Sequence, residues 1–157
     1  MLRQTIATVS ALIIAGSVNL PRQASADAAT AAIAAAQFVR SSLAAGDVVV
    51  LQDSGADAAL VSQVSSALKG TVHSRAEMQR CASNASSCRQ INAAAVLLSV
   101  APRVTGDTAV VEVESFTRPP VSQKSKRLAL NMEFRQVTLV RVAGVWSVRK
   151  SELLERG

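Results

Sequence analysis

Asp53, His73 and Glu77 are the residues whose types and spacing best suit acid–base chemistry. His73 is the sole imidazole of the chain, and Glu77 lies one helical turn beyond it. The pattern favours a simpler interpretation, in which His73 is a partly exposed histidine ahead of a helix. Asp53 opens an Asp-Ser-Gly stretch, and no Gly-x-Ser-x-Gly elbow surrounds Ser54, so the sequence favours a turn there. We therefore assign no catalytic residue and keep a small acid–base enzyme as an alternative.

Cys81 and Cys88 are the two cysteines, and they bracket the polar loop CASNASSC. Because the chain reads as exported, an oxidising compartment favours a disulfide between them. The spacing lacks the Cys-x-x-Cys form of a redox pair. Two cysteines and one histidine cannot supply the four ligands of a structural zinc site, and no phosphate-binding glycine motif occurs. We expect neither a metal nor a cofactor.

Three glutamates, Glu112, Glu114 and Glu133, lie close together on strands expected from alternation. General acid–base work requires a carboxyl group in an apolar pocket with a raised pKa. The parity of these positions instead places them opposite the apolar side of each strand. We expect solvent to be their neighbour.

The basic residues gather in the second half of the chain. The whole sequence has 17 Lys and Arg against 11 Asp and Glu. A weak basic face is expected from Lys124, Lys126, Arg127, Arg135 and Arg149. Nucleic-acid binding would add exposed aromatics for stacking, but aromatics make up 3% of the chain. We expect a solvated face suited to anionic envelope components, and no nucleic-acid partner.

Residues 1–26 read as a cleavable signal peptide. A basic start at Arg3 precedes a mostly apolar run over 6–18, and Ala24-Ser25-Ala26 supplies small residues for a peptidase. The run is well short of the roughly 20 residues that span a bilayer. We expect cleavage between Ala26 and Asp27, which leaves one exported domain over 27–157, periplasmic or extracellular and without a membrane span.

The first half of that domain reads as mainly helical. We expect a helix over 27–45, a strand over 47–52, a turn at 53–55 and a helix over 56–69 that ends at Gly70. The larger apolar residues of the first helix are Ile33, Phe38, Val39 and Leu43. Ser74 and Glu77 have the spacing of a capping box, which predicts a short helix from there to about Cys81.

The second half reads as two β-hairpins. A turn at 105–108, with Gly106 where positive φ is needed, pairs Val104 with Ala109 and so on down to Leu98 with Ser115. That register puts the apolar residues of both strands on one side.

The second hairpin turns at 143–144, which pairs Arg141 with Trp146 and allows a cation–π contact. The apolar residues within 128–134 occupy even-numbered positions, whereas the apolar residues Val137 and Leu139 occupy odd-numbered positions. We expect a β-bulge near Arg135–Gln136 to reconcile the two sets. A strand buried on both sides is the alternative.

The predicted class is therefore α+β, with N-terminal helices packed on one face of a curved antiparallel sheet of about four to five strands. The blocks Gly106–Val111 and Val137–Val148, with the Gly144–Trp146 turn, resemble secreted members of the nuclear transport factor 2-like (cystatin-like cone) superfamily. That resemblance implies a bent sheet around a helix and an apolar pocket, in which family enzymes use Asp or an Asp–His pair. No such motif maps onto this chain, so no catalytic residue is carried over.

The function we expect from the sequence is an exported, non-enzymatic binding or scaffold module. The alternatives are an acid–base enzyme using a cone-like pocket, and a module that contacts anionic envelope components through the basic face. A small apolar ligand, an envelope component and a second copy of the chain all stay open as partners.

Overall fold

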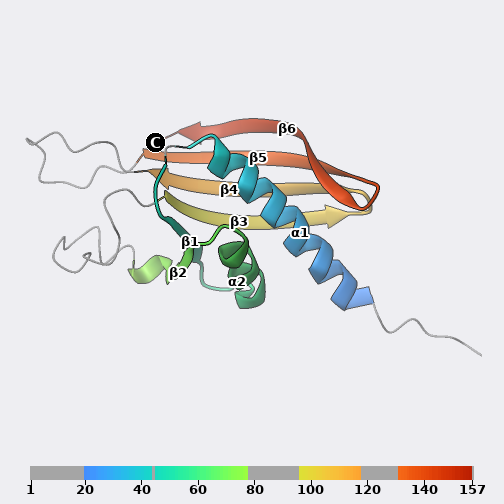
Figure 1. Cartoon of the computed structure of the whole chain (residues 1–157), viewed down its shortest axis with the longest axis horizontal. Helices are drawn as coiled ribbons and strands as arrows, with labels where there is room; N and C mark the ends of the chain where they lie inside the picture. The colour runs from blue at the N-terminus through green and yellow to red at the C-terminus, as the bar shows by residue number, and fades with distance from the viewer. Residues whose placement is uncertain (1–19, 44, 78–95, 118–130, 157) are drawn as a thin grey trace, which may run out of the picture.

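The computed structural model describes residues 20–43, 45–77, 96–117 and 131–156, and these form helices packed on a six-stranded sheet (Figure 1). In chain order the elements are α1 (Leu20–Ser41), β1 (Val48–Gln52), α2 (Ala58–Ala67), β2 (Thr71–Ser74), β3 (Val96–Thr105), β4 (Thr108–Thr117), β5 (Asn131–Val142) and β6 (Val145–Arg156). A further helix begins at Arg75. The predicted α+β class is confirmed, with α1 and α2 on one side of the sheet, called here the helix side. None of the described helices is long and apolar enough to cross a membrane.

The sheet is mixed, in the order β2-β1-β3-β4-β5-β6. Strands β3 to β6 form the expected antiparallel meander, whereas β1 pairs in parallel with both β2 and β3. The short strand β2 was not expected from the sequence. It arises because α2 carries the chain from the end of β1 back to its start, as in a β-α-β unit.

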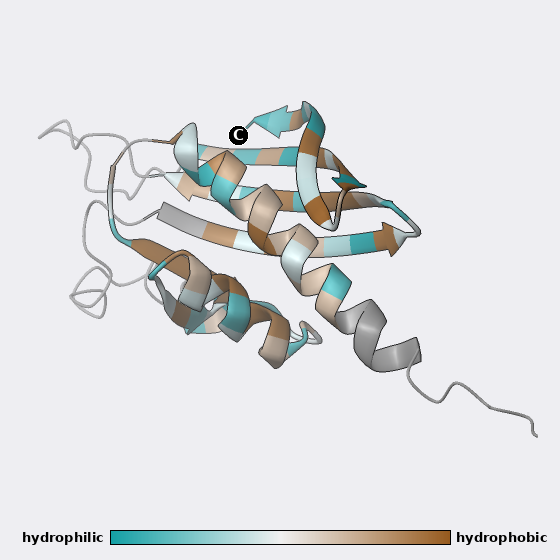
Figure 2. Ribbon diagram, turned by 45° about the vertical axis from the view of Figure 1, so that its right-hand side comes forward, coloured by the Kyte–Doolittle hydropathy of each residue, from teal (hydrophilic) through white to brown (hydrophobic). Residues whose placement is uncertain are grey.

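Helix α1 packs on the sheet mainly through alanine. Ala32, Ala35, Ala36 and Val39 are fully buried, whereas Phe38, expected in the apolar stripe, is 39% exposed. Small side chains let a helix backbone lie close to the strands, and this explains why alanines form the contact. Hydrophobic and hydrophilic residues alternate along the strands beneath (Figure 2).

Helix α2 has well-defined caps at both ends. The Asp57 carboxylate accepts a hydrogen bond from the Ala59 amide at 2.8 Å. At the other end Lys69 has φ 54°, and the Gly70 amide donates to the Ser65 carbonyl at 2.8 Å, as in a Schellman motif. Gly70 is required for a different reason, because a Cβ there would lie 2.8 Å from the Val48 carbonyl oxygen.

The first hairpin has the predicted register. Val104 pairs with Ala109, Val100 with Val113 and Leu98 with Ser115, and Gly106 has φ 59°. The buried members of this set, Leu98, Ala109, Val111, Val113 and Ser115, all lie on the helix side. Turn chemistry and alternation therefore specified the same pairing.

The second hairpin also turns where expected, with Ala143 and Gly144 at positive φ and Arg141 opposite Trp146. The expected bulge is partly wrong. The β5–β6 pairing does shift between Phe134 and Arg135, and again between Thr138 and Leu139.

The extra residues at those shifts, however, are Leu154 and Arg149 of β6, which the pairing skips. Strand β5 itself pairs with β4 without interruption. Val137 and Leu139 consequently lie on the helix side, and Phe134 lies on the opposite side of the sheet, called here the far side.

Candidate functional site

Four polar residues meet on the far side of the sheet, where β1 and β2 end. We call Asp53, Arg75, Ser99 and Glu114 the Arg75 cluster. Asp53 follows β1 and Arg75 follows β2, and their parallel pairing brings both carboxyl ends to one edge. Ser99 and Glu114 are cross-strand partners on β3 and β4, one residue out of phase with the buried positions.

Arg75 connects the two carboxylates of the cluster. Its guanidinium donates to Asp53 through Nε and Nη2, and Nη2 also lies 2.5 Å from Glu114 Oε2. Ser99 Oγ donates to Asp53 Oδ2 at 2.8 Å. The Arg75 guanidinium also lies 5.6 Å from the centre of the Phe116 ring, as a cation–π contact requires. The cluster therefore carries a net charge of about −1 at neutral pH, from one cation and two carboxylates.

These contacts fix the protonation states of the cluster. The hydrogen bond from Arg75 holds the pKa of Asp53 below its ordinary value, with a smaller contribution from Ser99, even though partial burial opposes the shift. The carboxylates in turn raise the pKa of Arg75. Asp53 therefore stays ionised at neutral pH and accepts hydrogen bonds, and it is poorly suited to donate a proton.

The predicted capping box is confirmed beside this cluster. The Ser74 amide donates to Glu77 Oε2 at 2.8 Å, and the Glu77 amide donates to Ser74 Oγ at 3.2 Å. His73 lies on β2 itself, and its Nδ1 is 3.6 Å from Glu77 Oε2. The structure therefore brings His73 to Glu77 as the spacing suggested, while the carboxylate of Asp53 is bound by Arg75.

An open pocket of about 520 Å³ adjoins the cluster. Its lining comes from two loops, Gln52–Ala56 and Ser74–Ala76. Crevices at the carboxyl ends of parallel strands are common ligand sites in sheets of this kind. The lining groups are an amide, hydroxyls, a carboxylate and a guanidinium, and the apolar side chains among them are the methyl groups of Ala56 and Ala76.

Several residues named from the sequence lie outside the described part of the chain. These are Cys81, Cys88, Lys124, Lys126 and Arg127, and the expected disulfide thus stays a prediction. Two members of the basic face are described. Arg135 is bound to Glu133 at 3.0 Å, and Arg149 is exposed on β6 at one of the register shifts.

From alternation, Glu133 was expected on the side of the strand opposite Phe134 and the other even-numbered apolar residues, facing solvent. The structure places it on the helix side instead. Since β5 has no bulge, Glu133 shares the helix side with Val137, and only 18% of its side chain is exposed. Burial would raise the pKa of Glu133, but hydrogen bonds from Arg135 and Arg156 outweigh it and lower the pKa. Glu112 and Glu114 do lie on the far side, where each binds an arginine, Arg103 and Arg75 respectively, rather than solvent alone.

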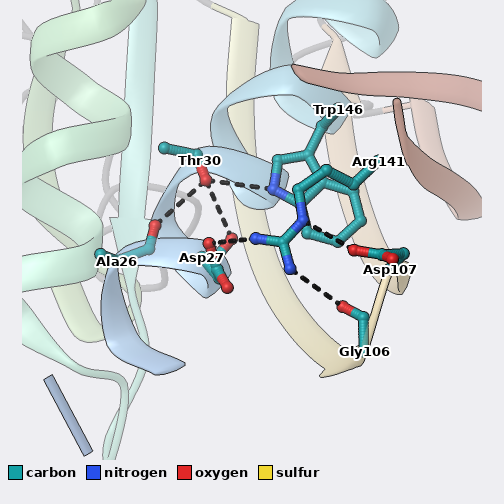
Figure 3. Close-up of polar contacts among 7 residues, drawn as sticks. All are labelled: Ala26, Asp27, Thr30, Gly106, Asp107, Arg141 and Trp146. Carbon is teal, nitrogen blue, oxygen red and sulfur yellow. Dashed lines mark hydrogen bonds and ion pairs between the residues drawn. The ribbon is translucent and has the colours of Figure 1, made fainter. Parts of the chain in front are cut away.

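A second cluster joins α1 to the second hairpin (Figure 3). We call Asp27, Thr30, Asp107, Arg141 and Trp146 the helix latch. Arg141 binds Asp27 at 2.7 Å and Asp107 at 3.0 Å, and these bonds raise its pKa. The Trp146 indole N–H donates to Thr30 Oγ1 at 3.1 Å. The latch fixes the N-terminal half of α1 against the second hairpin.

The Arg75 cluster was missed because its members come from four elements. Arg75 lies 22 residues from Asp53 and 39 from Glu114 along the chain. The available signal was indirect, since Glu114 and Ser99 share the far side in the predicted hairpin and need a polar partner there. Strand β2 is what positions Arg75 beside Ser99 and Glu114. Because β2 was not predicted from the sequence, the position of Arg75 could not be predicted either.

Searches of protein-family models, curated proteins and solved structures found no match to this chain. Within the described residues, no group of three or more His, Cys, Asp or Glu is arranged to hold a metal ion. The functional argument therefore depends on the pocket and the two clusters.

Proposed function

We propose that this protein is an exported binding module, and that its pocket takes a small neutral or amino-bearing saccharide of the cell envelope. The observation that carries the proposal is the set of polar side chains that line the pocket beside the Arg75 cluster, namely Gln52, Asp53, Ser54, Ser74 and Arg75. Export is supported by the N-terminal pattern that predicts cleavage before Asp27. The bonds from Arg141 to Asp27 and from Trp146 to Thr30 involve only residues after that cut, so the mature chain retains them.

The chemistry of the lining favours this ligand class. Arg75 is already balanced by two carboxylates, so the cluster disfavours an anion. The small apolar ligand left open by the sequence would meet no wholly apolar side chain larger than the methyl groups of Ala56 and Ala76 in this lining. Hydroxyl and amino groups, by contrast, can donate to Asp53 and exchange hydrogen bonds with Gln52 and Ser54.

The acid–base enzyme is less well supported by the geometry. A catalytic acid needs a raised pKa, whereas Arg75 lowers the pKa of Asp53. His73 is bound beside Glu77 and does not line the pocket. The anionic-envelope alternative depends on the basic face. Of its two described residues, Arg149 is exposed, whereas Arg135 is already paired with Glu133. Membership of the cone-like superfamily stays a prediction that the resemblance alone supports.

The test is a titration of the isotope-labelled chain 27–157 with cellobiose and with N,N′-diacetylchitobiose, followed by amide chemical shifts. We expect shifts at residues 52–56 and 74–76. Gln52→Ala and Ser54→Ala should weaken binding, because each removes a group that lines the pocket. Gln63→Ala and Ser62→Ala, at exposed positions on α2, are matched controls that should bind as the parent does.

Unchanged shifts in the pocket with every saccharide would reject the ligand class. Vesicles of phosphatidylglycerol provide the opposing arm. Salt-sensitive binding to them, abolished by Arg149→Glu, would favour the anionic-envelope alternative instead.

A further inference from the structure

The bond expected to be cut on export lies inside helix α1. The sequence predicts cleavage between Ala26 and Asp27, whereas α1 runs from Leu20 to Ser41. The residues on both sides of this bond therefore have helical backbone. The helix continues past the bond toward the N-terminus for about two turns.

A peptidase needs a different conformation at the bond it cuts. Proteins commonly bind a peptide as an added extended strand, so that the main chain supplies hydrogen bonds and alternate side chains fill pockets. In an extended chain, residues two apart lie on one side, which suits recognition of an Ala-x-Ala motif. The backbone of Ala24-Ser25-Ala26 is helical instead. The bond can therefore be cut only while this part of α1 is open.

The helix latch holds the bond in its helical form (Figure 3). Thr30 Oγ1 lies 3.1 Å from the Ala26 carbonyl oxygen, which belongs to the bond itself, and 3.1 Å from the Asp27 carbonyl oxygen. The Trp146 indole N–H binds the same hydroxyl oxygen. Arg141 binds the Asp27 carboxylate at 2.7 Å. Opening the helix at this bond therefore requires the latch to break.

We propose that the helix latch protects the Ala26–Asp27 bond from signal peptidase, so that the leader is removed only while the latch is open. In the cut, water adds to the Ala26 carbonyl carbon and the C–N bond breaks. Ala26 leaves as a carboxylate, and Asp27 keeps the nitrogen as an α-ammonium group. A chain that closes its latch first keeps residues 1–26. This inference rests on the export part of the proposed function and is independent of the pocket and its ligand.

The same contacts suit the chain after the cut. The latch bonds to Asp27 and Thr30 come from residues that stay in the chain. The first turn of α1, as it begins at Leu20, holds no acidic residue, whereas cutting makes Asp27 the first residue. A carboxylate in the first turn is favourable to the helix macrodipole, and here it also offsets the charge of the new α-ammonium group.

The rate of cutting in the folded chain tests the proposal. The full chain 1–157 in detergent micelles is incubated with purified bacterial signal peptidase, beside a synthetic peptide of residues 1–45. The peptide lacks the second hairpin and cannot form the latch. We expect the peptide to be cut between Ala26 and Asp27, as located by mass spectrometry. The folded chain should be cut at least about tenfold more slowly, because cutting waits for local opening.

Variants far from the bond in the sequence separate the latch from the recognition motif. Arg141→Met leaves residues 1–45 unaltered, so a higher rate of cutting acts through the fold, and we expect about a tenfold rise. Arg103→Met is the matched control, since Arg103 is exposed and binds Glu112, and it should be cut as the parent is. Gly70→Ala weakens the fold away from the latch. Circular dichroism checks that each variant is folded.

A folded chain cut as fast as the peptide would overturn the proposal and leave export standing. The same holds for an Arg141→Met chain that is cut no faster than Arg103→Met, or no faster than a Gly70→Ala chain of equal stability. A peptide that is not cut between Ala26 and Asp27 would overturn the predicted site, and with it both this inference and the N-terminal support for export.

Discussion

The guanidinium of Arg141 lies over the indole ring of Trp146, 5.1 Å from the ring centre. The two residues face each other across the second hairpin, and both also contact α1, through Asp27 and Thr30. One cross-strand pair thus serves as the attachment point of a helix from the other end of the chain.

Replacing Arg141 should therefore loosen the attachment of α1. Arg141→Met removes the bonds to Asp27 and Asp107 and the contact with the ring, so we expect a lower midpoint of thermal unfolding. Arg103→Met is the matched control, since Arg103 has one carboxylate partner, Glu112, and is 66% exposed. Calorimetry of both variants decides the matter, and an equal fall in the two midpoints would contradict a special role for the latch.

The end of α2 allows two glycine-related changes with opposite expected signs. Lys69→Gly relieves a left-handed backbone conformation and should stabilise by up to about 1 kcal/mol. Gly70→Ala forces a Cβ against the Val48 carbonyl and should destabilise by about 1–3 kcal/mol. Urea unfolding measures both. A Gly70→Ala variant that is more stable than the parent would show that the backbone of β1 at Val48 can shift to accommodate the added Cβ.

Acid should destabilise the protein through Asp53 and Glu133. Both carboxyl groups have a pKa lowered by folding, so their contribution to stability is present above the unfolded values of about 3.9 and 4.3 and is lost as pH falls through the folded values. Arg75→Gln should cost roughly 1 kcal/mol at neutral pH, since the pair is partly exposed, and should flatten the loss in acid.

The measurement is the free energy of unfolding in urea at several pH values between neutral and strongly acidic. Arg149→Gln, at a position without a described carboxylate partner, should show the same dependence of the free energy of unfolding on pH as the parent protein. A slope that is equally steep in Arg75→Gln would show that Asp53 is not held by Arg75 in solution.

The disulfide predicted from Cys81 and Cys88 is tested by counting thiols in the purified chain 27–157. We expect none to react under denaturing, non-reducing conditions and two to react after reduction. Closing so short a loop should stabilise by about 2–3 kcal/mol on the chain-entropy model, so reduction should lower the unfolding midpoint. Two reactive thiols before reduction would end the prediction.

The two hairpins could be predicted from the sequence because their information is local. Gly106 and Gly144 fix the turns, and alternation then fixes the register of each strand. Strand β2 could not be predicted this way, because Thr71–Ser74 is four residues long and its partner β1 lies across α2. The Arg75 cluster was missed for the same reason, since it exists only once β1 and β2 are placed in parallel.

The bulge shows a different limit. The expected bulge in β5 would have brought Phe134 and Val137 to one side of the sheet, but β5 is regular and the two residues lie on opposite sides. The two irregularities of the β5–β6 pairing are in β6, at Leu154 and Arg149, and they do not change which side the β5 residues face. Glu133 was assigned to the wrong side because of the expected bulge.

The helix latch also sets an order on the maturation of the chain. Asp27 and Thr30 find their partners 114 and 116 residues later, so α1 cannot complete its docking until nearly the whole polypeptide has been synthesised. A nascent chain that lacks Arg141 and Trp146 therefore has its first helix unsecured. Such a chain acquires its final packing only after its last hairpin has been synthesised.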